Sequence, residues 1–348
     1  MNETIEQLNE TLRGRYELER PIGTGGMATV YLAHDVRHDR QVAIKVLRSE
    51  LSSGLGADRF LREIKIAARL HHPHILAVFD SGRADDLLYY VMPYVKGESL
   101  RQTIAREEQL PVRETVRILR EVVDALAFAH AHGVVHRDIK PDNILITGDH
   151  VTVADFGVAK AVSAAGSSSL TGVGIPIGTP TYMAPEQAAG DPAVDHRSDI
   201  YAVGVLAYEL LIGRPPFAEG TTQEILAAHL TKRPTSLRDQ RSDIAEPLQR
   251  IVMRCLEKNP SDRWQSADEL RGLFDAIATP SGELSSITLA GLRRPTRWAY
   301  GVIAALVALV IGATFVLHPE VLAVFLPDKG SALVPQRVLV AQFENATG

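Results

Sequence analysis

The spacing of apolar residues along the chain changes once, near residue 100. Before that point, short strand-like runs such as 41–47 and 88–92 alternate with turns rich in glycine and aspartate. A single helix, expected over about 57–70, interrupts these runs because its apolar residues recur at helical spacing. After residue 100, helical spacing dominates. This single change of period predicts an α+β fold in two lobes, a small one rich in strands and a larger helical one.

The second part of the chain combines several helical segments with one pair of strands. Apolar residues from Val116 to His130 form a helical stripe that ends near Gly133, since glycine tolerates the left-handed conformation of helix ends. Two short strands, 144–146 and 151–153, flank a Gly-Asp turn and predict a β-hairpin. Further helices are expected over 197–212, 221–230, 246–257 and 266–277.

The composition is that of a folded protein without a strong overall charge. With 45% hydrophobic residues among 348, the chain can bury a sizeable core. Its formal net charge of −5 gives no global basic field, so we expect no nucleic acid partner. The one cysteine, Cys255, excludes an internal disulfide and is interpreted as a buried structural thiol. Residues 1–14 are polar, unlike a secretory signal peptide, so the first domain is expected to stay in the cytoplasm.

A glycine-rich turn, with glycines at 23, 25 and 26, lies between two of the expected strands. Because glycine has no Cβ, the backbone amides of such a turn can approach phosphate groups closely. An ordinary glycine turn would have the same letters, so the pattern alone leaves both interpretations open. No Gly-Lys-Ser or Gly-Lys-Thr follows, which excludes a Walker loop, and the strand-to-helix context of a dinucleotide-binding fingerprint is missing.

Lys45 lies in the next expected strand, between apolar neighbours. Taken alone, it could be an exposed strand lysine. Glu63, on the apolar face of the helix over 57–70, offers a carboxylate that can pair with it. A desolvated ammonium needs a counter-charge, and this pairing would point Lys45 at phosphate oxygens.

The segment from His136 to Asn143 contains six side chains that can carry charge or form hydrogen bonds. Such a density is unusual for a purely structural loop. The hairpin predicted after it would bring Asp155 back beside Asn143. A carboxylate and an amide oxygen facing each other suit Mg²⁺, a hard cation that takes few protein ligands and shares its shell with water and phosphates.

Together these motifs resemble the eukaryotic-type protein kinase domain, from about Tyr16 to Ala278. The resemblance implies the bilobal protein-kinase fold and, more narrowly, a bacterial, Hanks-type transmembrane serine/threonine kinase. The motifs that match, in the order and at separations similar to those of the family, are Gly23 and Gly25, Lys45, Glu63, His136-Arg137-Asp138, Asn143, Asp155-Phe156-Gly157 and Ala184-Pro185-Glu186.

The resemblance also implies ATP as a substrate and Mg²⁺ or Mn²⁺ as the metal. Asp138 resembles the catalytic aspartate that accepts the proton of the substrate hydroxyl, and Lys140 the lysine that neutralises the γ-phosphate. Asn143 and Asp155 resemble the metal ligands, and Lys45 the lysine that reaches the α- and β-phosphates. The residues implied to bind ATP are Ile22, Gly23, Thr24, Gly25, Gly26, Val30, Ala43, Lys45, Glu63, Met92, Pro93, Val95 and Leu145, with Ile22, Val30, Ala43 and Leu145 around adenine, Met92 as gatekeeper and Val95 as hinge contact.

This sequence departs from the family pattern at two positions. Ala28 replaces a frequent third glycine, which should stiffen the turn slightly. Pro93 follows the gatekeeper where an acidic residue is frequent, and although proline lacks an N–H, the family contact there uses the carbonyl oxygen. We expect ATP binding to survive both changes.

Other residues bear on class, structure and control. The segment 138–143 together with 178–186 resembles serine/threonine rather than tyrosine kinases. Asp199 resembles the aspartate that braces the catalytic loop, and Arg263, which could also be a surface arginine, resembles the structural partner of Glu186.

Between Asp155 and Glu186 the serines and threonines occupy the position of an activation loop. Arg137 could receive a phosphate from that loop. Thr171 and Ser169 are the candidate phosphosites, although both could also be unmodified residues of a flexible loop, and Thr179 is expected to bond Asp138 and Lys140.

The segment 298–317 contains twenty residues without a charge. As a helix it would rise about 30 Å, the thickness of the hydrocarbon layer of a membrane. Three arginines lie just before it, and Trp298 and Tyr300 are placed at the interface depth. This pattern predicts a single-pass helix in the plasma or inner membrane, in contact with the lipid bilayer, with the preceding domain in the cytoplasm. The alternative is a buried core helix.

The leading hypothesis is an active kinase that phosphorylates serine and threonine on proteins, with self-activation and possible homodimerisation implied by the resemblance. The alternative is a pseudokinase receptor or scaffold that binds nucleotide or partners without catalysis. The expected domains are an N-terminal extension (1–15), the kinase domain (16–277), a juxtamembrane linker (278–297), the transmembrane helix (298–317) and an extracytoplasmic segment (318–348), the last resembling the start of a truncated module.

Overall fold

A computed structural model of the chain describes residues 8–26, 28–47, 55–84, 87–158 and 180–278. These residues form one compact unit. Within these ranges, none of the helices combines the length and apolar character needed to cross a membrane. The apolar segment expected to span the bilayer, 298–317, lies outside the described residues, as do the linker and the C-terminal segment.

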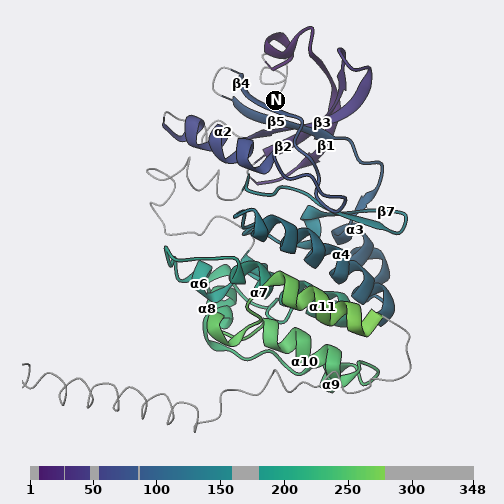
Figure 1. The fold of residues 1–348 in the computed structure, drawn as a ribbon, viewed down its shortest axis with the longest axis vertical. Coiled ribbons are helices and arrows are strands. Elements are labelled where there is room, and N and C mark those ends of the chain that lie inside the picture. The colour runs from purple at the N-terminus through teal and green to yellow at the C-terminus, as the bar shows by residue number, and fades with distance from the viewer. Residues whose placement is uncertain (1–7, 27, 48–54, 85–86, 159–179, 279–348) are drawn as a thin grey trace, which may run out of the picture. The chain divides into compact units, whose positions relative to one another are not determined.

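The N-terminal part is an antiparallel five-stranded sheet with strand order β1-β2-β3-β5-β4 (Figure 1). Alternate residues of each strand point to opposite faces, so the sheet has an apolar layer on each side. On one face lie Ala43, Leu88, Tyr90 and Met92, and on the other Tyr31, Val42, Ile44 and Val91. The strands are β1 (Tyr16–Thr24), β2 (Ala28–Asp35), β3 (Arg40–Leu47), β4 (Asp80–Ala84) and β5 (Leu87–Pro93).

Helix α2 (Leu55–Ala67) covers the first of these faces. Its apolar stripe packs into the same cluster through Ala57, Phe60 and Ile64, as the helical spacing predicts. The opposite face is covered by residues 8–12, which are helical and bury Leu8 and Leu12. Part of the expected N-terminal extension therefore belongs to the core of the small lobe.

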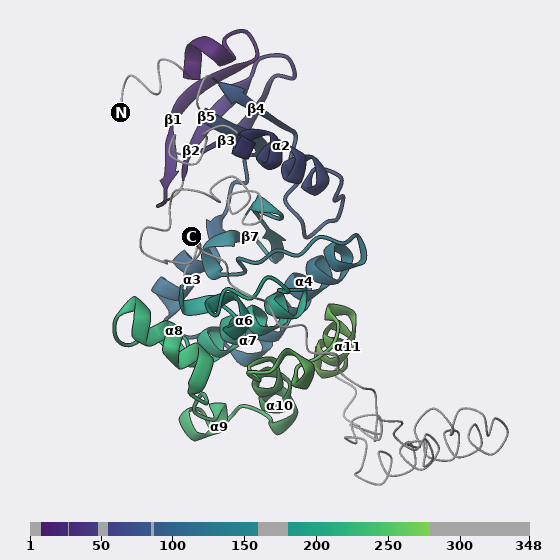
Figure 2. The same cartoon turned by 90° about the vertical axis from the view of Figure 1, so that its left-hand side faces the viewer.

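The C-terminal part is helical and is arranged around α7 (Arg197–Ile212), which is buried along nearly its whole length (Figure 2). Gly204 lets this helix approach α10 (Glu246–Cys255) closely, because a Cβ at that position would lie 2.6 Å from the Cβ of Cys255. Cys255 is buried, as expected. The other helices are α3 (Leu100–Glu107), α4 (Val112–Ala131), α6 (Pro185–Ala188), α8 (Thr222–Thr231), α9 (Leu237–Gln240), α10 (Glu246–Cys255) and α11 (Ala267–Ala278).

A second, three-stranded sheet positions the catalytic segment. Its strands are β6 (Glu98–Ser99), β7 (Ile144–Thr147) and β8 (His150–Val153), paired in the order β6-β7-β8. The chain between α2 and β4 is attached to this sheet, since the His74 ring donates to the carbonyl oxygen of Val151 at 2.8 Å. Glu121 on α4 accepts from the Val151 N–H, also at 2.8 Å. These bonds connect the three-stranded sheet to the helical part.

The expected two-lobe α+β arrangement is confirmed, and so are the β7–β8 hairpin and the helices expected over 197–212, 221–230, 246–257 and 266–277. Besides the helical residues 8–12, the sequence did not anticipate the labelled helices α3, α6 and α9. α6 and α9 have only four residues each, and α3 has two buried apolar residues, Leu100 and Ile104, which is too few for a periodic signal.

A buried histidine on α8 makes stability depend on pH. Burial, with a further contribution from the charge of Lys258, lowers the pKa of His229 to about 4. The ring has no exposed surface, and its Nδ1 accepts the hydroxyl of Tyr201 at 2.9 Å. In the unfolded chain this histidine has its ordinary pKa of 6.5. Between that value and about 4 the unfolded chain binds the proton and the folded chain does not, so stability is lost as the pH falls.

We therefore expect the free energy of unfolding to fall by about 2 kcal/mol as the pH is lowered from about 7 to about 5, because of His229. Urea unfolding of the wild type and of His229→Gln over this range measures the effect. The stability of the wild type relative to the variant should decrease with falling pH, because glutamine does not titrate. A pH-independent difference between the two proteins would contradict the assignment.

Candidate active site

The glycine-rich turn joins β1 to β2 at the end of the five-stranded sheet. Gly23 pairs with Val30 across the strands, and the Gly25 N–H donates to the Ala28 carbonyl oxygen at 2.9 Å. A Cβ at Gly26 would meet no atom within 4 Å. Ile22 and Thr24 lie on the same exposed end of β1, with 37% of Ile22 accessible. The turn thus presents glycine backbone at the open end of the hairpin.

Lys45 lies in β3 and forms an ion pair with Asp155. Burial alone would raise the pKa of the Asp155 carboxyl, but the charge and hydrogen bond of Lys45, with a further bond from Tyr90, hold that pKa below its usual value. The carboxylate is therefore anionic although little exposed. This pair links the five-stranded sheet to the turn that follows β8.

The sequence indicated Glu63 as the partner of Lys45, whereas the structure pairs Lys45 with Asp155. Lys45 and Asp155 are 110 positions apart in the chain. Whether they meet depends on how the five-stranded sheet lies relative to the three-stranded sheet. Glu63 is half-buried on α2, close to the same turn, since a Cβ at Gly157 would lie 3.8 Å from the Glu63 carbonyl oxygen and 3.4 Å from the Cβ of Ala67. A Cβ at 157 would make only ordinary van der Waals contacts with α2, and glycine is favoured there by its φ of +73°, in the left-handed region.

Asp138, Lys140 and Asn143 form a second polar group in the segment before β7. The Lys140 ammonium lies 2.8 Å from Asp138 Oδ2. The Asn143 side-chain amide donates to both the carbonyl oxygen and Oδ2 of Asp138, at 2.8 and 3.1 Å. This geometry turns the amide N–H groups of Asn143 toward Asp138 and its oxygen away from it. The Asp138 carboxylate keeps 24% of its surface exposed, so it is accessible to a reacting group.

The hairpin brings the two expected metal ligands to adjoining positions, as predicted. Asn143 precedes β7 and Asp155 follows β8, and the Ala154 N–H donates to the Asn143 carbonyl oxygen at 2.8 Å. Asp155 has φ of +66°, in the left-handed region that non-glycine residues rarely adopt. Such strain is typical of functional sites, where surrounding contacts hold the backbone in place.

The backbone of the catalytic segment is held by buried groups. The Asp199 carboxylate accepts the N–H groups of His136 and Arg137 at 2.8 and 2.7 Å, and the Nε2 of His130 at 2.8 Å. Burial would raise the pKa of Asp199, but the His130 bond and neighbouring charges lower it. Arg137, like Asp155, has a positive φ, of +68°. Asp199 therefore braces a strained loop, in agreement with the sequence analysis.

The residues expected around adenine come from several strands. Val30, Ala43 and Met92 meet in one apolar cluster, in which Ala43 and Met92 are direct cross-strand partners. Pro93 pairs with Val42 at the end of β5, and Val95 follows in the connection to β6. Leu145 in β7 pairs with Ser99 in β6, so this connection runs close to Leu145.

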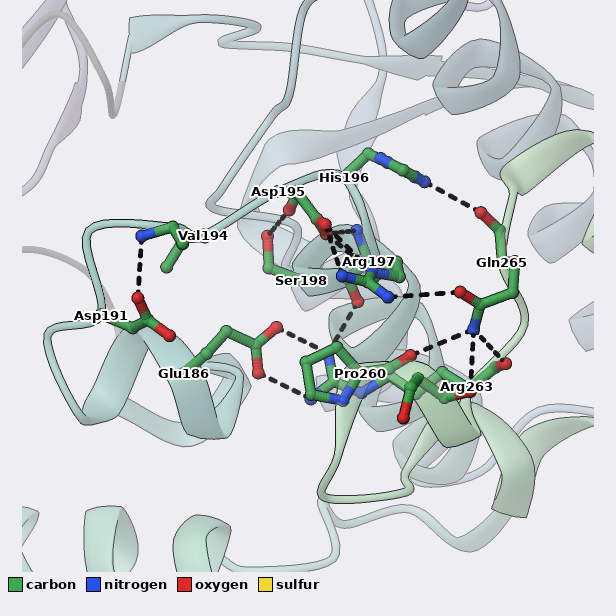
Figure 3. A network of polar contacts seen from close by, with 12 residues as sticks. Glu186, Asp191, Val194, Asp195, His196, Arg197, Ser198, Pro260, Arg263 and Gln265 are labelled. Atoms are coloured by element: carbon green, nitrogen blue, oxygen red, sulfur yellow. Dashed lines mark hydrogen bonds and ion pairs between the residues drawn. The ribbon is translucent and has the colours of Figure 1, made fainter. Parts of the chain in front are cut away.

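Arg263 and Glu186 form a buried ion pair (Figure 3). Two guanidinium nitrogens meet the two carboxylate oxygens, each at 2.6 Å, and Arg263 has no exposed surface. The same guanidinium donates to the carbonyl oxygens of Glu257, Arg197 and Lys258. Arg263 is therefore a buried structural residue rather than a surface arginine.

Sequence reasoning missed two groups of residues near the site. Tyr90 in β5 donates its hydroxyl to Asp155 Oδ1 at 2.5 Å. Arg101 on α3 lies 2.8 Å from Glu209 Oε1 and 2.5 Å from the hydroxyl of Tyr182, which itself bonds Glu209. Glu209 is a charged residue inside the apolar run of α7, and such a residue is a signal that could have been used. Thr171, Ser169 and Thr179 lie outside the described residues.

Comparison with known proteins agrees with the resemblance to protein kinases. The model of the protein kinase domain family matches residues 16–272. Serine/threonine-protein kinase PknB of Mycobacterium leprae is 41% identical over 278 residues, which are 78% of this chain and 44% of that protein. Serine/threonine-protein kinase PrkC of Bacillus subtilis is 39% identical over 277 residues, 77% of this chain and 42% of that protein.

A relative from Myxococcus xanthus, serine/threonine-protein kinase pkn3, is 41% identical over 285 residues, covering 79% of this chain and 52% of its own length. The chain thus spans about half the length of the curated relatives it matches. Among solved structures, the kinase domain of Mycobacterium tuberculosis PknI, crystallised as a point mutant, matches with a TM-score of 0.61 and 33% identity, over 76% of this chain and 96% of that one. The chain therefore belongs to the protein kinase domain family, and its relatives include bacterial serine/threonine-protein kinases.

Proposed function

We propose that this chain transfers phosphate from ATP to serine and threonine residues of proteins. The observation that carries the proposal is the meeting of two polar groups at the β7–β8 hairpin. Asp138 lies with Lys140 and Asn143 on one side, and Asp155 lies with Lys45 on the other. Every position that the chemistry needs is occupied by a competent side chain, which argues against a pseudokinase.

Asp138 is the residue we assign to proton transfer from the acceptor hydroxyl. Its carboxylate is partly exposed, and the Lys140 and Asn143 bonds hold it in one orientation. A positioned general base of this kind contributes about 10²–10⁴-fold to a rate. Lys140, directly beside it, places a positive charge where the negative charge of a transferred phosphate would collect. Lys45 supplies a second positively charged side chain, from the five-stranded sheet.

The residues present fit a divalent cation of the Mg²⁺ type, and Mn²⁺ has a similar preference for oxygen. Asp155 is an anionic carboxylate, and the oxygen of the Asn143 amide is directed away from Asp138. Hard cations prefer such oxygen ligands. A bound Mg²⁺ would neutralise phosphate charge. The chain's own part is to hold these two oxygens at adjoining ends of one hairpin.

The remaining assignments of the sequence stay proposals. We propose that ATP lies between the glycine-rich turn and the Val30, Ala43 and Met92 cluster, with Ile22 and Leu145 beside adenine. Thr171 and Ser169 are the proposed sites of autophosphorylation, and phosphopeptide mapping of the active protein tests both. Absence of phosphate from residues 163–171 would exclude them.

We also propose that residues 298–317 anchor the chain in a membrane, with the kinase domain (16–277) on the cytoplasmic side. Support comes from the uncharged run of twenty residues and the arginines that precede it. Recovery of the chain from cells in the soluble fraction after lysis would contradict this. We propose in addition that two copies of the chain associate, and sedimentation of the purified chain measures this.

The direct test is incubation of the chain with labelled ATP, Mg²⁺ and several acceptor proteins. We expect labelled phosphoserine and phosphothreonine, loss of labelling when the metal is removed with EDTA, and its return with added Mg²⁺ or Mn²⁺. The metal dependence is expected because the Asp155 and Asn143 oxygens would hold the cation that neutralises phosphate charge near Asp138. No incorporation into any acceptor would sink the proposal.

A further inference from the structure

Tyr90 places a hydroxyl group inside the apolar core of the small lobe. The side chain is 1% exposed and packs with Phe60, Ile64 and Leu88 between the sheet and α2. A buried phenol needs a partner for its hydroxyl, whereas phenylalanine would fill the same space without one. The packing therefore accounts for the ring but not for its oxygen.

That oxygen is directed at the carboxylate of Asp155. Tyr90 and Lys45 are cross-strand partners in β5 and β3, and each takes one oxygen of the same carboxylate. The Tyr90 hydroxyl donates to Oδ1 at 2.5 Å, and the Lys45 ammonium bonds Oδ2. Burial and the neighbouring Asp155 raise the pKa of Tyr90 well above its ordinary value, so the phenol keeps its proton and acts as the donor.

The two partners differ in freedom. Lys45 is a flexible chain of four methylenes ending in a compact charge, 20% exposed, so it can follow an incoming phosphate. Tyr90 is a rigid ring fixed in a close-packed core and cannot follow. When Lys45 turns to a phosphate, Oδ2 is released and Oδ1 stays bonded to the hydroxyl.

We propose that Tyr90 is a positioning residue whose hydroxyl fixes Oδ1 of Asp155, so that Oδ2 is presented to the divalent cation. The proposal rests on the proposed function, because it takes Asp155 as a metal ligand. It assigns to the sheet itself the orientation of a carboxylate whose backbone lies in the left-handed region, at φ of +66°. A ligating carboxylate held by an outer hydrogen bond binds its metal more tightly than one that can rotate.

The test compares Tyr90→Phe with Tyr89→Phe, a neighbour on the opposite face of the same strand. Titration calorimetry of the full chain with Mn²⁺ in the presence of ADP measures metal binding without catalysis. We expect Tyr90→Phe to weaken Mn²⁺ binding by about 10–100-fold. Binding of ADP in EDTA, and both affinities of Tyr89→Phe, should stay within about twofold of the wild type, because these do not involve Oδ1.

Kinetics give a second reading. The Mg²⁺ concentration for half-maximal rate should rise by a similar factor in Tyr90→Phe, while kcat at saturating metal stays within about threefold, since Asp138 is untouched. A merely structural hydroxyl would change thermal stability without moving the metal curve. Tyr90→Phe keeps the ring and removes only the oxygen, and its thermal unfolding, followed beside the metal titration, shows whether the variant is folded.

Unchanged or tighter Mn²⁺ binding by a folded Tyr90 variant would overturn the proposal, and tighter binding would mean that the hydroxyl competes with the metal. Failure of Tyr90→Phe to fold would also overturn it, because the hydroxyl would then serve stability. If the wild-type chain neither binds Mn²⁺ in the presence of ADP nor transfers phosphate, the proposed function is refuted instead.

Discussion

Replacement of Asp138 by asparagine is expected to lower kcat for phosphate transfer by about 10²–10⁴-fold, the usual contribution of a positioned general base. Asparagine has nearly the same shape but cannot accept the proton of the acceptor hydroxyl. It also removes the negative charge that holds the Lys140 ammonium at 2.8 Å. The rate of labelled phosphate transfer from ATP to an acceptor protein measures the loss.

The matched control is Asp142→Asn, four residues further along the same segment. Asp142 is also an aspartate, but half of its side chain is exposed and its contact is with Arg101 on α3, at 3.4 Å. We expect this variant to keep kcat within about threefold of the wild type, because the Asp142 carboxylate contacts Arg101 rather than Lys140 or Asn143. ATP affinity should be similar in all three proteins, since neither carboxylate belongs to the proposed nucleotide pocket. Retention of more than about a tenth of the activity by Asp138→Asn would exclude the assigned role.

The sequence predicted the elements well where periodicity is strong and the segment long. Helix α2 and the β7–β8 hairpin were anticipated because apolar spacing and turn residues agree locally. Helix α3 was not, since its two buried residues, Leu100 and Ile104, leave the rest of the helix polar. Its start is instead fixed by a capping box between Ser99 and Gln102, a short signal that is visible in the sequence.

The residue types of the site were predictable, but the contacts of Lys45 and Tyr90 with Asp155 were not. The polar density around Asp138 and the position of Asp155 are visible in the letters, because both flank a recognisable hairpin. The Lys45 bond to Asp155 depends on how two separate sheets meet, which no local pattern encodes. Tyr90 was missed for a similar reason. It stands beside Tyr89 in an apolar strand, and only the alternation of faces decides which tyrosine reaches the site.

The ion pair of Arg263 and Glu186 is expected to carry the largest share of stability of any single polar contact discussed for the described residues. Both partners are nearly inaccessible, and the guanidinium satisfies two carboxylate oxygens and three carbonyl oxygens. Removing one partner of such a pair leaves the other buried without compensation. Glu186 lies in α6, which two residues separate from the 3₁₀ turn Pro180–Tyr182.

Replacement of Arg263 by alanine should therefore lower the free energy of unfolding by about 3–5 kcal/mol. The control is Arg271→Ala, which removes an arginine paired with Asp124 and Asp268 but 42% exposed, and whose loss should cost at most about 1 kcal/mol. Arg263→Lys separates charge from geometry. Lysine keeps the positive charge but cannot bond both Glu186 oxygens and the carbonyl groups at once, so its loss should lie between the other two. Urea unfolding of the three variants measures these values. A loss below about 1 kcal/mol for Arg263→Ala would mean that water enters to solvate Glu186, and that the network of Figure 3 contributes geometry rather than stability.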